Sequence, residues 1–100
     1  FMNYYIYIMS NSSNTIIYIG FTNDLVRRVY EHKNELVDGF SKKFHTHKLV
    51  HFEIYSTAYD AIAREKQLKK WTREKKNSLI EKDNPEWIDL WDRINNFEKL

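Results

Sequence analysis

With 100 residues, of which 42% are hydrophobic, 16% aromatic and 30% charged, the chain has the composition of a folded protein and not of a disordered one. The length suits one compact domain over residues 1–100, so we expect no separate substrate-recognition domain. The sequence contains no cysteine, which excludes disulfide bonds and thiolate metal sites, so a metal ion would be held by oxygen or histidine nitrogen.

The net charge of +2 is small, but the basic residues are concentrated in one segment. Residues 64–76 carry seven basic and two acidic side chains, a local charge of +5. A basic run on a helix can neutralise phosphates, which predicts nucleic-acid contacts at Lys66, Lys69, Lys70 and Arg73. A solvated, lysine-rich helix surface is the alternative interpretation, and it is the more common case.

The first two predicted elements are strands. Residues 3–9 and 15–20 are rich in β-branched and aromatic side chains, and the turn-forming sequence NSSN separates them, so the pattern predicts an antiparallel hairpin. With the turn centred between the two serines, Tyr7 lies opposite Tyr18 and both phenols share one face of the sheet. The opening FMNYYIYIMS is short and has no basic region before it, which favours a strand over a signal or membrane segment and predicts a cytoplasmic protein.

A helix is predicted after the hairpin, with Asn23 or Asp24 as its N-cap. Its inner side recurs at spacings of 4, 3 and 4 residues, through Leu25, Val29, His32 and Leu36. Arg28 lies one turn before His32 on nearly the same side of this helix.

A loop around Gly39 then leads to a third strand over residues 49–55, in which apolar and polar residues alternate. The next segment, 59–71, predicts a helix whose core side is formed by Ala61, Ile62, Leu68 and Trp71. Glu65 lies among these apolar positions, where a carboxylate is unexpected.

Two further helices complete the predicted elements. Thr72 starts one that runs to about Lys82, and Asn84 with Pro85 forms the N-cap and first turn of the last. The core side of that last helix is predicted to be Trp87, Ile88, Trp91 and Ile94. The element order ββαβααα predicts an α+β (mixed α/β) fold, in which a small, three-stranded, mainly antiparallel sheet packs with about four helices.

Five polar residues fall on faces that the pattern turns inward: Tyr7, Tyr18, Arg28, His32 and Glu65. Buried charges are costly unless they are paired or bind a metal, so Arg28 and Glu65 need an explanation. A structural ion pair between these two residues is one explanation, and the pattern alone favours it. A catalytic or metal site is the other.

Three histidines lie close together in the sequence, at His45, His47 and His51. Imidazole nitrogen is a good zinc ligand, which makes a zinc site one interpretation of this group. Their spacing matches no zinc motif, and histidines at strand edges are ordinary, so we expect no zinc site from these residues.

Short motifs along most of the chain point in a common direction. The sequence YIY at Tyr5–Tyr7 is followed about ten residues on by YIG at Tyr18–Gly20, and then by RRVYEH at Arg27–His32. At this spacing the three motifs resemble the GIY-YIG nuclease family. In the second half, AIAREKQLKKW at Ala61–Trp71 and NPEW at Asn84–Trp87 resemble the small stand-alone branch of that family, related to the N-terminal nuclease domain of the excision-repair subunit UvrC.

The resemblance implies an active-site role for six residues: Tyr7, Tyr18, Arg28, His32, Glu65 and Asn84. It implies that Glu65 holds the metal, a single Mg²⁺ or Mn²⁺ ion with a shell of oxygen ligands. For Asn84, the predicted helix cap is an equally good explanation of the residue.

Hydrolysis of a phosphodiester needs a nucleophile, neutralisation of charge on phosphorus and help for the leaving oxygen. The resemblance implies that Arg28 neutralises the charge, while a tyrosine whose pKa is lowered by Arg28 and the metal takes a proton from the attacking water. We favour Tyr7 as this base, with Tyr18 orienting the water or phosphate, although the sequence does not rank them. His32 would relay a proton or bind phosphate.

The chain departs from the family pattern at two positions. Tyr5 replaces the first glycine of the family name, a replacement that the stand-alone branch accepts. Phe21 stands where some members have lysine, which removes a phosphate contact and bears on activity more than on fold. Gly20, just before it, would let the substrate approach the backbone closely.

We therefore expect a metal-dependent endonuclease that hydrolyses DNA phosphodiester bonds with low sequence specificity, on branched or single-stranded DNA, in repair or recombination. One alternative is a catalytically weak or inactive DNA- or RNA-binding module of the same fold. Another is an interaction subunit whose protein partner supplies targeting.

Overall fold

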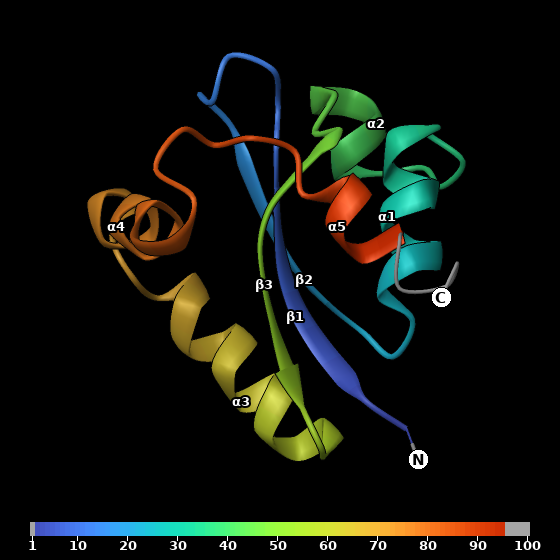
Figure 1. Ribbon diagram of the computed structural model, residues 1–100, viewed down its shortest axis with the longest axis vertical. Helices are drawn as coiled ribbons and strands as arrows, with labels where there is room; N and C mark the ends of the chain where they lie inside the picture. Colours follow the sequence, from blue (N-terminus) through green and yellow to red (C-terminus); the bar gives the residue numbers. More distant parts are fainter. Residues whose placement is uncertain (1, 96–100) are drawn as a thin grey trace.

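The computed structural model describes residues 2–95, in which the elements follow the order ββααβααα (Figure 1). The strands are β1 (Tyr4–Ser10), β2 (Ile17–Thr22) and β3 (Lys48–Tyr55). The helices of these residues are α1 (Leu25–Lys33), α2 (Phe40–Phe44), α3 (Ala58–Lys69), α4 (Arg73–Asp83) and α5 (Trp91–Asn95). The α+β fold is confirmed, with one more helix than the pattern predicts. None of the described helices combines the length and apolar character needed to cross a membrane.

The sheet is fully antiparallel and has the strand order β2-β1-β3. In the hairpin, Tyr7 pairs with Gly20, so the predicted pairing of Tyr7 with Tyr18 is wrong by two residues. The side-chain oxygen of Asn11 accepts the backbone N–H groups of the two residues before β2, and Asn14 has a φ of 59°. These features centre the turn one residue later than predicted. Because the error is an even number of residues, both phenols still share one face.

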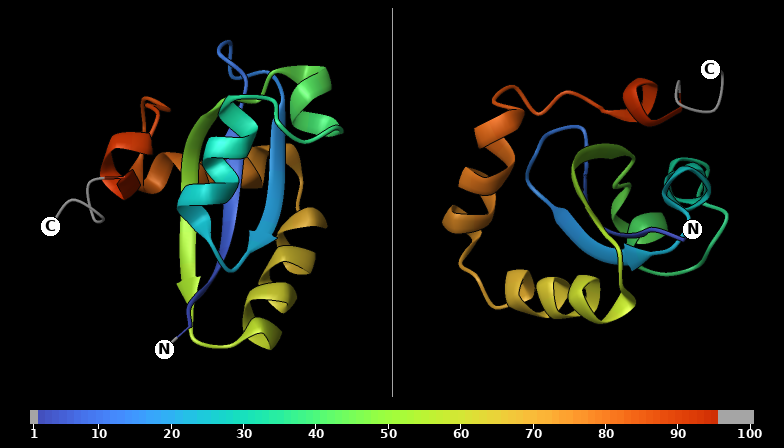
Figure 2. Two further views of the ribbon diagram at one scale, coloured as in Figure 1. Left: turned by 90° about the vertical axis from the view of Figure 1, so that its right-hand side faces the viewer. Right: turned by 60° about the horizontal axis from the view of Figure 1, so that its bottom comes forward.

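Alternate residues of β1 face two separate cores. Ile6 and Ile8 pack against the helices on one face of the sheet, through Ala61 and Leu68 of α3 and Ile80 of α4. On the opposite face, the buried residues are Tyr7, Met9, Leu25, Val29, Leu49, Leu90 and Ile94. Figure 2 shows the result, with α3 and α4 on one side of the sheet and α1 and α5 on the other. Tyr7 and Tyr18, the tyrosines of the two hairpin motifs, therefore both face the α1 side of the sheet.

Three of the helices begin directly after a side chain that caps their first turn. The side chains of Asp24, Thr57 and Thr72 each accept a backbone N–H of the first turn of α1, α3 and α4. Helix α1 ends at Lys33, however, so Leu36 is outside the helix and 62% exposed. The predicted extension of the α1 core side to Leu36 is wrong.

The segment predicted as a loop around Gly39 contains the short helix α2. Gly39, with a φ of 130°, precedes it, and His45, in the left-handed region with a φ of 56°, follows it. The hydroxyls of Ser41 and Thr46 are both buried and lie 2.6 Å apart. This hydrogen bond joins α2 to the residues that lead into β3, and no periodic pattern reveals it.

The region after α4 differs most from the prediction. Asn84 is the C-cap of α4 and not the N-cap of the last helix, which begins only at Trp91. Ile88, predicted to be in the core, is 54% exposed, whereas Leu90 is buried. The carboxylate of Asp89 accepts the N–H groups of Leu49 and Trp91 and holds this stretch as a loop against β3.

Candidate active site

Tyr7 is at the centre of a cluster of aromatic and basic side chains on the α1 side of the sheet. It is fully buried on the central strand, and its phenol oxygen lies 2.9 Å from Nε2 of His32 on α1. The ring of Tyr18, on β2, lies beside both, with centroid separations of 6.2 Å to Tyr7 and 5.4 Å to His32. Two neighbouring strands and one turn of α1 thus bring together three of the predicted site residues.

Gly20 makes room for the ring of Tyr7. A Cβ atom added to Gly20 would lie 2.4 Å from both the Cζ and the hydroxyl oxygen of Tyr7, well inside van der Waals contact. On the side where a Cβ would lie, the space beside Gly20 is therefore filled by the phenol. Since β2 is an edge strand, a ring that crosses Gly20 carries its hydroxyl towards the edge of the sheet.

A pocket of about 320 Å³ lies next to these rings. It is lined by Tyr18, Arg28, Glu31 and His32, and by residues of the segment 37–41 that begins α2. Nε of Arg28 donates to the carboxylate of Glu31 at 3.2 Å, while its side chain stays 37% exposed. A half-exposed guanidinium beside aromatic rings suits a phosphate group, which it can bind through its forked donors.

Burial has the largest effect on the pKa of Tyr7. Desolvation is the largest influence on its pKa and raises it well above the ordinary value, and the nearby Tyr18 raises it further. Arg28 lowers the pKa, as predicted, but by less than burial raises it. In the protein alone, Tyr7 is therefore a protonated phenol at neutral pH, and Arg28 by itself does not bring its pKa below the ordinary value.

His32 is shifted in the opposite sense. Burial, followed by the positive charge of Arg28, lowers the pKa of His32 to about 4, against a smaller opposing effect of Glu31. The imidazole is consequently neutral at pH 7. Its Nε2 can accept a hydrogen bond from the Tyr7 hydroxyl, or donate one to it in the other tautomer.

Glu65 lies on α3, outside the hydrogen-bonded cluster. Its side chain is 18% exposed, and its carboxylate lies 3.3 Å from Nζ of Lys69, one turn later. Its negative charge is near enough to Tyr7 to raise the pKa of the phenol. Arg28 pairs with Glu31 and Glu65 with Lys69, so the structural ion pair between Arg28 and Glu65 is not formed.

Asn84 is the predicted site residue that the structure does not bring to the cluster. Its Nδ2 donates to the carbonyls of Val50 and Ile88, at 3.1 and 2.9 Å, and its Oδ1 accepts the N–H of Ile88 at 3.0 Å. These bonds engage both ends of a buried amide and tie the loop after α4 to β3. The geometry supports a structural role for Asn84.

The basic run is divided between surface and structural positions. Lys66 and Lys70 are exposed on and just after α3, as a phosphate contact requires, and Lys69 is the partner of Glu65. Arg73 instead donates to two backbone carbonyls of the hairpin turn, at 2.8 and 2.9 Å. Its guanidinium fastens α4 to the hairpin, so a nucleic-acid contact by Arg73 has no support in the geometry.

Glu31 borders the pocket and was not predicted as a site residue. Besides its bond to Arg28, it lies 3.8 Å from Nε of Arg27. The spacing of three and four residues on one helix was a signal that could have identified it. The ring of Phe40, 5.4 Å from that of Tyr18, had no such signal, because α2 itself was not predicted.

Comparison with known proteins assigns most of the chain to a family. The family model described as the GIY-YIG catalytic domain matches residues 3–78. A UPF0213 protein of Haloquadratum walsbyi is 38% identical over 78 residues, which cover 78% of this chain and 86% of that protein. A UPF0213 protein of Syntrophus aciditrophicus is 36% identical over 83 residues, which cover 82% and 93%.

The fold also has a counterpart among solved structures. The solution NMR structure of a UPF0213 protein from Bacillus halodurans has a TM-score of 0.56 and 24% identity, and the match covers 86% of this chain and 90% of that one. The family match includes both tyrosine strands, α1 and α3, and therefore the positions of Tyr7, Tyr18, Arg28, His32 and Glu65. On this match and these relatives, the chain belongs to the GIY-YIG nuclease family.

Proposed function

We propose that this protein is a metal-dependent endonuclease that hydrolyses DNA phosphodiester bonds. The observation that carries the proposal is the convergence of four side chains from three elements, namely Tyr7, Tyr18, Arg28 and His32. The negative charge of Glu65, on a fourth element, also raises the pKa of Tyr7. A phosphodiester under attack gains negative charge, and the guanidinium of Arg28 is placed at the pocket to neutralise it.

The contact between Tyr7 and His32 supplies a path for the proton of the attacking water. As the phenol oxygen of Tyr7 takes this proton, its own hydroxyl proton passes to Nε2 of the neutral His32. Tyr7 need not exist as a free phenolate, which its raised pKa disfavours. A bound phosphate would offset the charge of Arg28 and raise the pKa of His32, making it a better acceptor. Tyr18, which lines the pocket, orients the water or the phosphate.

Glu65 is the residue that would hold the Mg²⁺ or Mn²⁺ ion. Within residues 2–95, no group of three or more ligating side chains includes it. One carboxylate suffices for Mg²⁺, which keeps several waters and takes substrate phosphates as further ligands. The ion pair with Lys69 is half exposed and worth about 0–1 kcal/mol, so it is a weak competitor. When bound, the ion would neutralise charge on the phosphate and on the leaving 3′ oxygen.

The proposed substrate is branched or single-stranded DNA. The proposed process is DNA repair or recombination. The exposed Lys66 and Lys70 offer phosphate contacts, which position a strand without reading its sequence. We therefore propose low sequence specificity.

The test incubates supercoiled plasmid and a branched oligonucleotide with purified protein and Mg²⁺ or Mn²⁺. Wild type should nick at least one substrate, and Glu65→Gln should reduce the rate by about a hundredfold or more. Glu74→Gln, which alters an exposed carboxylate on α4, is the matched control and should cut like wild type. Binding without cleavage by wild type would support the inactive binding module instead, and equal cleavage by wild type and Glu65→Gln would overturn the role of Glu65.

A further inference from the structure

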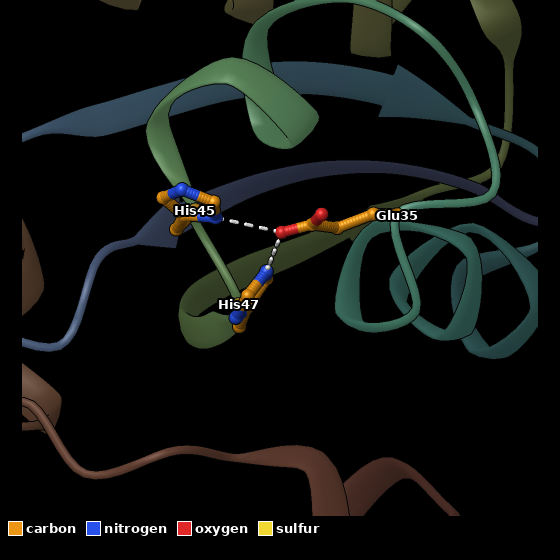
Figure 3. A group of neighbouring side chains, drawn as sticks. All are labelled: Glu35, His45 and His47. Atoms are coloured by element: carbon orange, nitrogen blue, oxygen red, sulfur yellow. Dashed lines mark hydrogen bonds and ion pairs between the residues drawn. The ribbon is translucent and has the colours of Figure 1, made fainter.

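Glu35, His45 and His47 form a cluster of side chains of the kinds that ligate metals, and it contains none of the active-site residues (Figure 3). Nδ1 of His45 lies 2.7 Å, and Nε2 of His47 lies 2.8 Å, from the same carboxylate oxygen of Glu35. One ligand atom from each residue lies within 4.8 Å of the other two. In the described part of the chain, this is the one group of three such residues.

The backbone presents these side chains from the ends of three elements. Glu35 follows α1, His45 caps the end of α2, and His47 directly precedes β3. Glu35 and His45 both have left-handed backbone conformations, with φ of 53° and 56°, which are uncommon for residues other than glycine. The three side chains thus bring together the two ends of the segment 35–47. Local backbone preference alone does not explain the shape of this segment.

The donor set favours an ion of the zinc class over Mg²⁺ or Ca²⁺. Two imidazole nitrogens and one carboxylate are zinc ligands, and three protein ligands leave one position open for water. With bonds of about 2.0–2.1 Å in a tetrahedral site, ligand atoms lie roughly 3.3 Å apart. The Glu35 oxygen would have to move about half an ångström from each imidazole, which is feasible because the side chains of Glu35 and His45 are 30% and 67% exposed.

We propose that Glu35, His45 and His47 form a binding site for a divalent transition-metal ion of the zinc class. Spacing along the chain predicted no such site, because the carboxylate lies 10 and 12 residues before the two histidines. His51, the third histidine of that stretch, bonds to Glu53 and takes no part.

The position of the site indicates its effect. Val37, Asp38, Phe40 and Ser41 line the candidate active-site pocket, and all four lie between Glu35 and His45. An ion that joins Glu35 to His45 and His47 therefore closes a loop whose interior residues form one wall of the pocket. It acts as a clip that restricts this wall, separately from the ion proposed at Glu65.

The experiment titrates untagged, EDTA-treated protein with zinc sulfate at pH 7.5 by isothermal calorimetry, and repeats the titration with Co²⁺ to record its visible absorption. One equivalent of Zn²⁺ should bind and raise the melting temperature in proportion to the logarithm of its concentration. Glu35→Gln and His47→Asn should each weaken binding by about tenfold or more. Gln preserves hydrogen bonding to the imidazoles but is a poor zinc ligand.

Glu65→Gln is the matched control, and it should bind Zn²⁺ like wild type, because the proposed Mg²⁺ ligand is not part of this site. Circular dichroism melting in EDTA checks that each variant is folded. If folded Glu35→Gln and His47→Asn bind Zn²⁺ as tightly as wild type, or if wild type binds no equivalent, the proposal is wrong. Either result would leave the test of DNA cleavage unaffected.

Discussion

The phenol of Tyr7 lies over the bare Cα of Gly20, its direct partner on the neighbouring strand. The first tyrosine motif and the glycine of the second are therefore one structural unit. The ring needs a position without a side chain opposite it, and the hairpin register supplies that position. This contact also carries the hydroxyl to His32.

Gly20→Ala should lower both stability and cleavage. The added methyl group would lie 2.4 Å from the Tyr7 ring, which is buried and cannot move freely, so we expect a loss of about 1–3 kcal/mol in the free energy of unfolding. Urea unfolding measures this loss. In the background of Tyr7→Ala the same substitution should cost less, because the clashing ring is gone. Equal costs in both backgrounds would contradict the contact.

Tyr7→Phe should separate chemistry from folding. The ring still fills the space over Gly20, so the loss is confined to interactions of the hydroxyl, chiefly the hydrogen bond to His32, at a cost of about 1 kcal/mol. Cleavage under single-turnover conditions should fall by about 10²–10⁴, as expected for loss of a general base. Tyr5→Phe, on the same face of β1 but outside the cluster, is the control and should retain the wild-type rate. A wild-type rate for Tyr7→Phe would remove Tyr7 from the proton path.

The low pKa of His32 predicts a pH dependence of stability. The folded-state pKa of about 4 lies below the ordinary 6.5, so the folded state binds fewer protons between these values. Stability is then full above pH 6.5 and declines as the pH falls towards 4. For this partly exposed ring, we expect a loss on the order of 1–2 kcal/mol. NMR titration of the ring should give a midpoint near 4, and a midpoint near 6.5 would contradict its burial beside Arg28.

Glu53 should contribute to stability down to low pH. Burial raises its pKa, but hydrogen bonds from His51, Arg64 and Tyr55 together lower it to about 2, from an ordinary 4.5. Its contribution is therefore complete above pH 4.5 and is lost as the pH falls through 2. Glu53→Gln should cost on the order of 1–2 kcal/mol at neutral pH. Denaturant unfolding at pH 7 and pH 3 measures both effects, and the difference between variant and wild type should shrink at the lower pH.

The basic residues should separate by role in DNA binding. Replacing both Lys66 and Lys70 by alanine should weaken DNA binding and reduce the slope of log affinity against log salt by about 2. Arg73→Lys should leave this slope unchanged and instead lower stability by about 1 kcal/mol, because lysine cannot reach both turn carbonyls with a forked donor. Fluorescence anisotropy of labelled DNA across a salt series distinguishes phosphate binding from a structural role. A reduced slope for Arg73→Lys would show that Arg73 binds phosphate after all.

Periodicity and caps predicted the elements that depend on local sequence. Asp24 and Thr72 were each predicted to start a helix, and the alternation in residues 49–55 predicted a strand, since these signals reflect the neighbouring residues alone. The hairpin register was wrong because Asn11 sets the turn through hydrogen bonds to backbone five residues away. The loop after Asn84 was missed for a similar reason, since β3 supplies its partner.

The same distinction applies to the site. Helical and strand periods turned Tyr7, His32 and Glu65 inward without knowledge of what they face. The partner of Arg28 and the meeting of Glu35 with two histidines depend on how α1, α2 and β3 pack, which the pattern does not contain. The pKa of Tyr7 is a further case, because its direction follows from burial that only the three-dimensional structure reveals.

The alternation of β1 between two cores limits how this strand can change. Loss or gain of one amino acid inside it would exchange the two sets of side chains, moving an isoleucine to the pocket and a phenol beneath α3. Point substitutions in β1 affect one core at a time, but a single-codon insertion or deletion would disrupt hydrophobic packing and catalysis together.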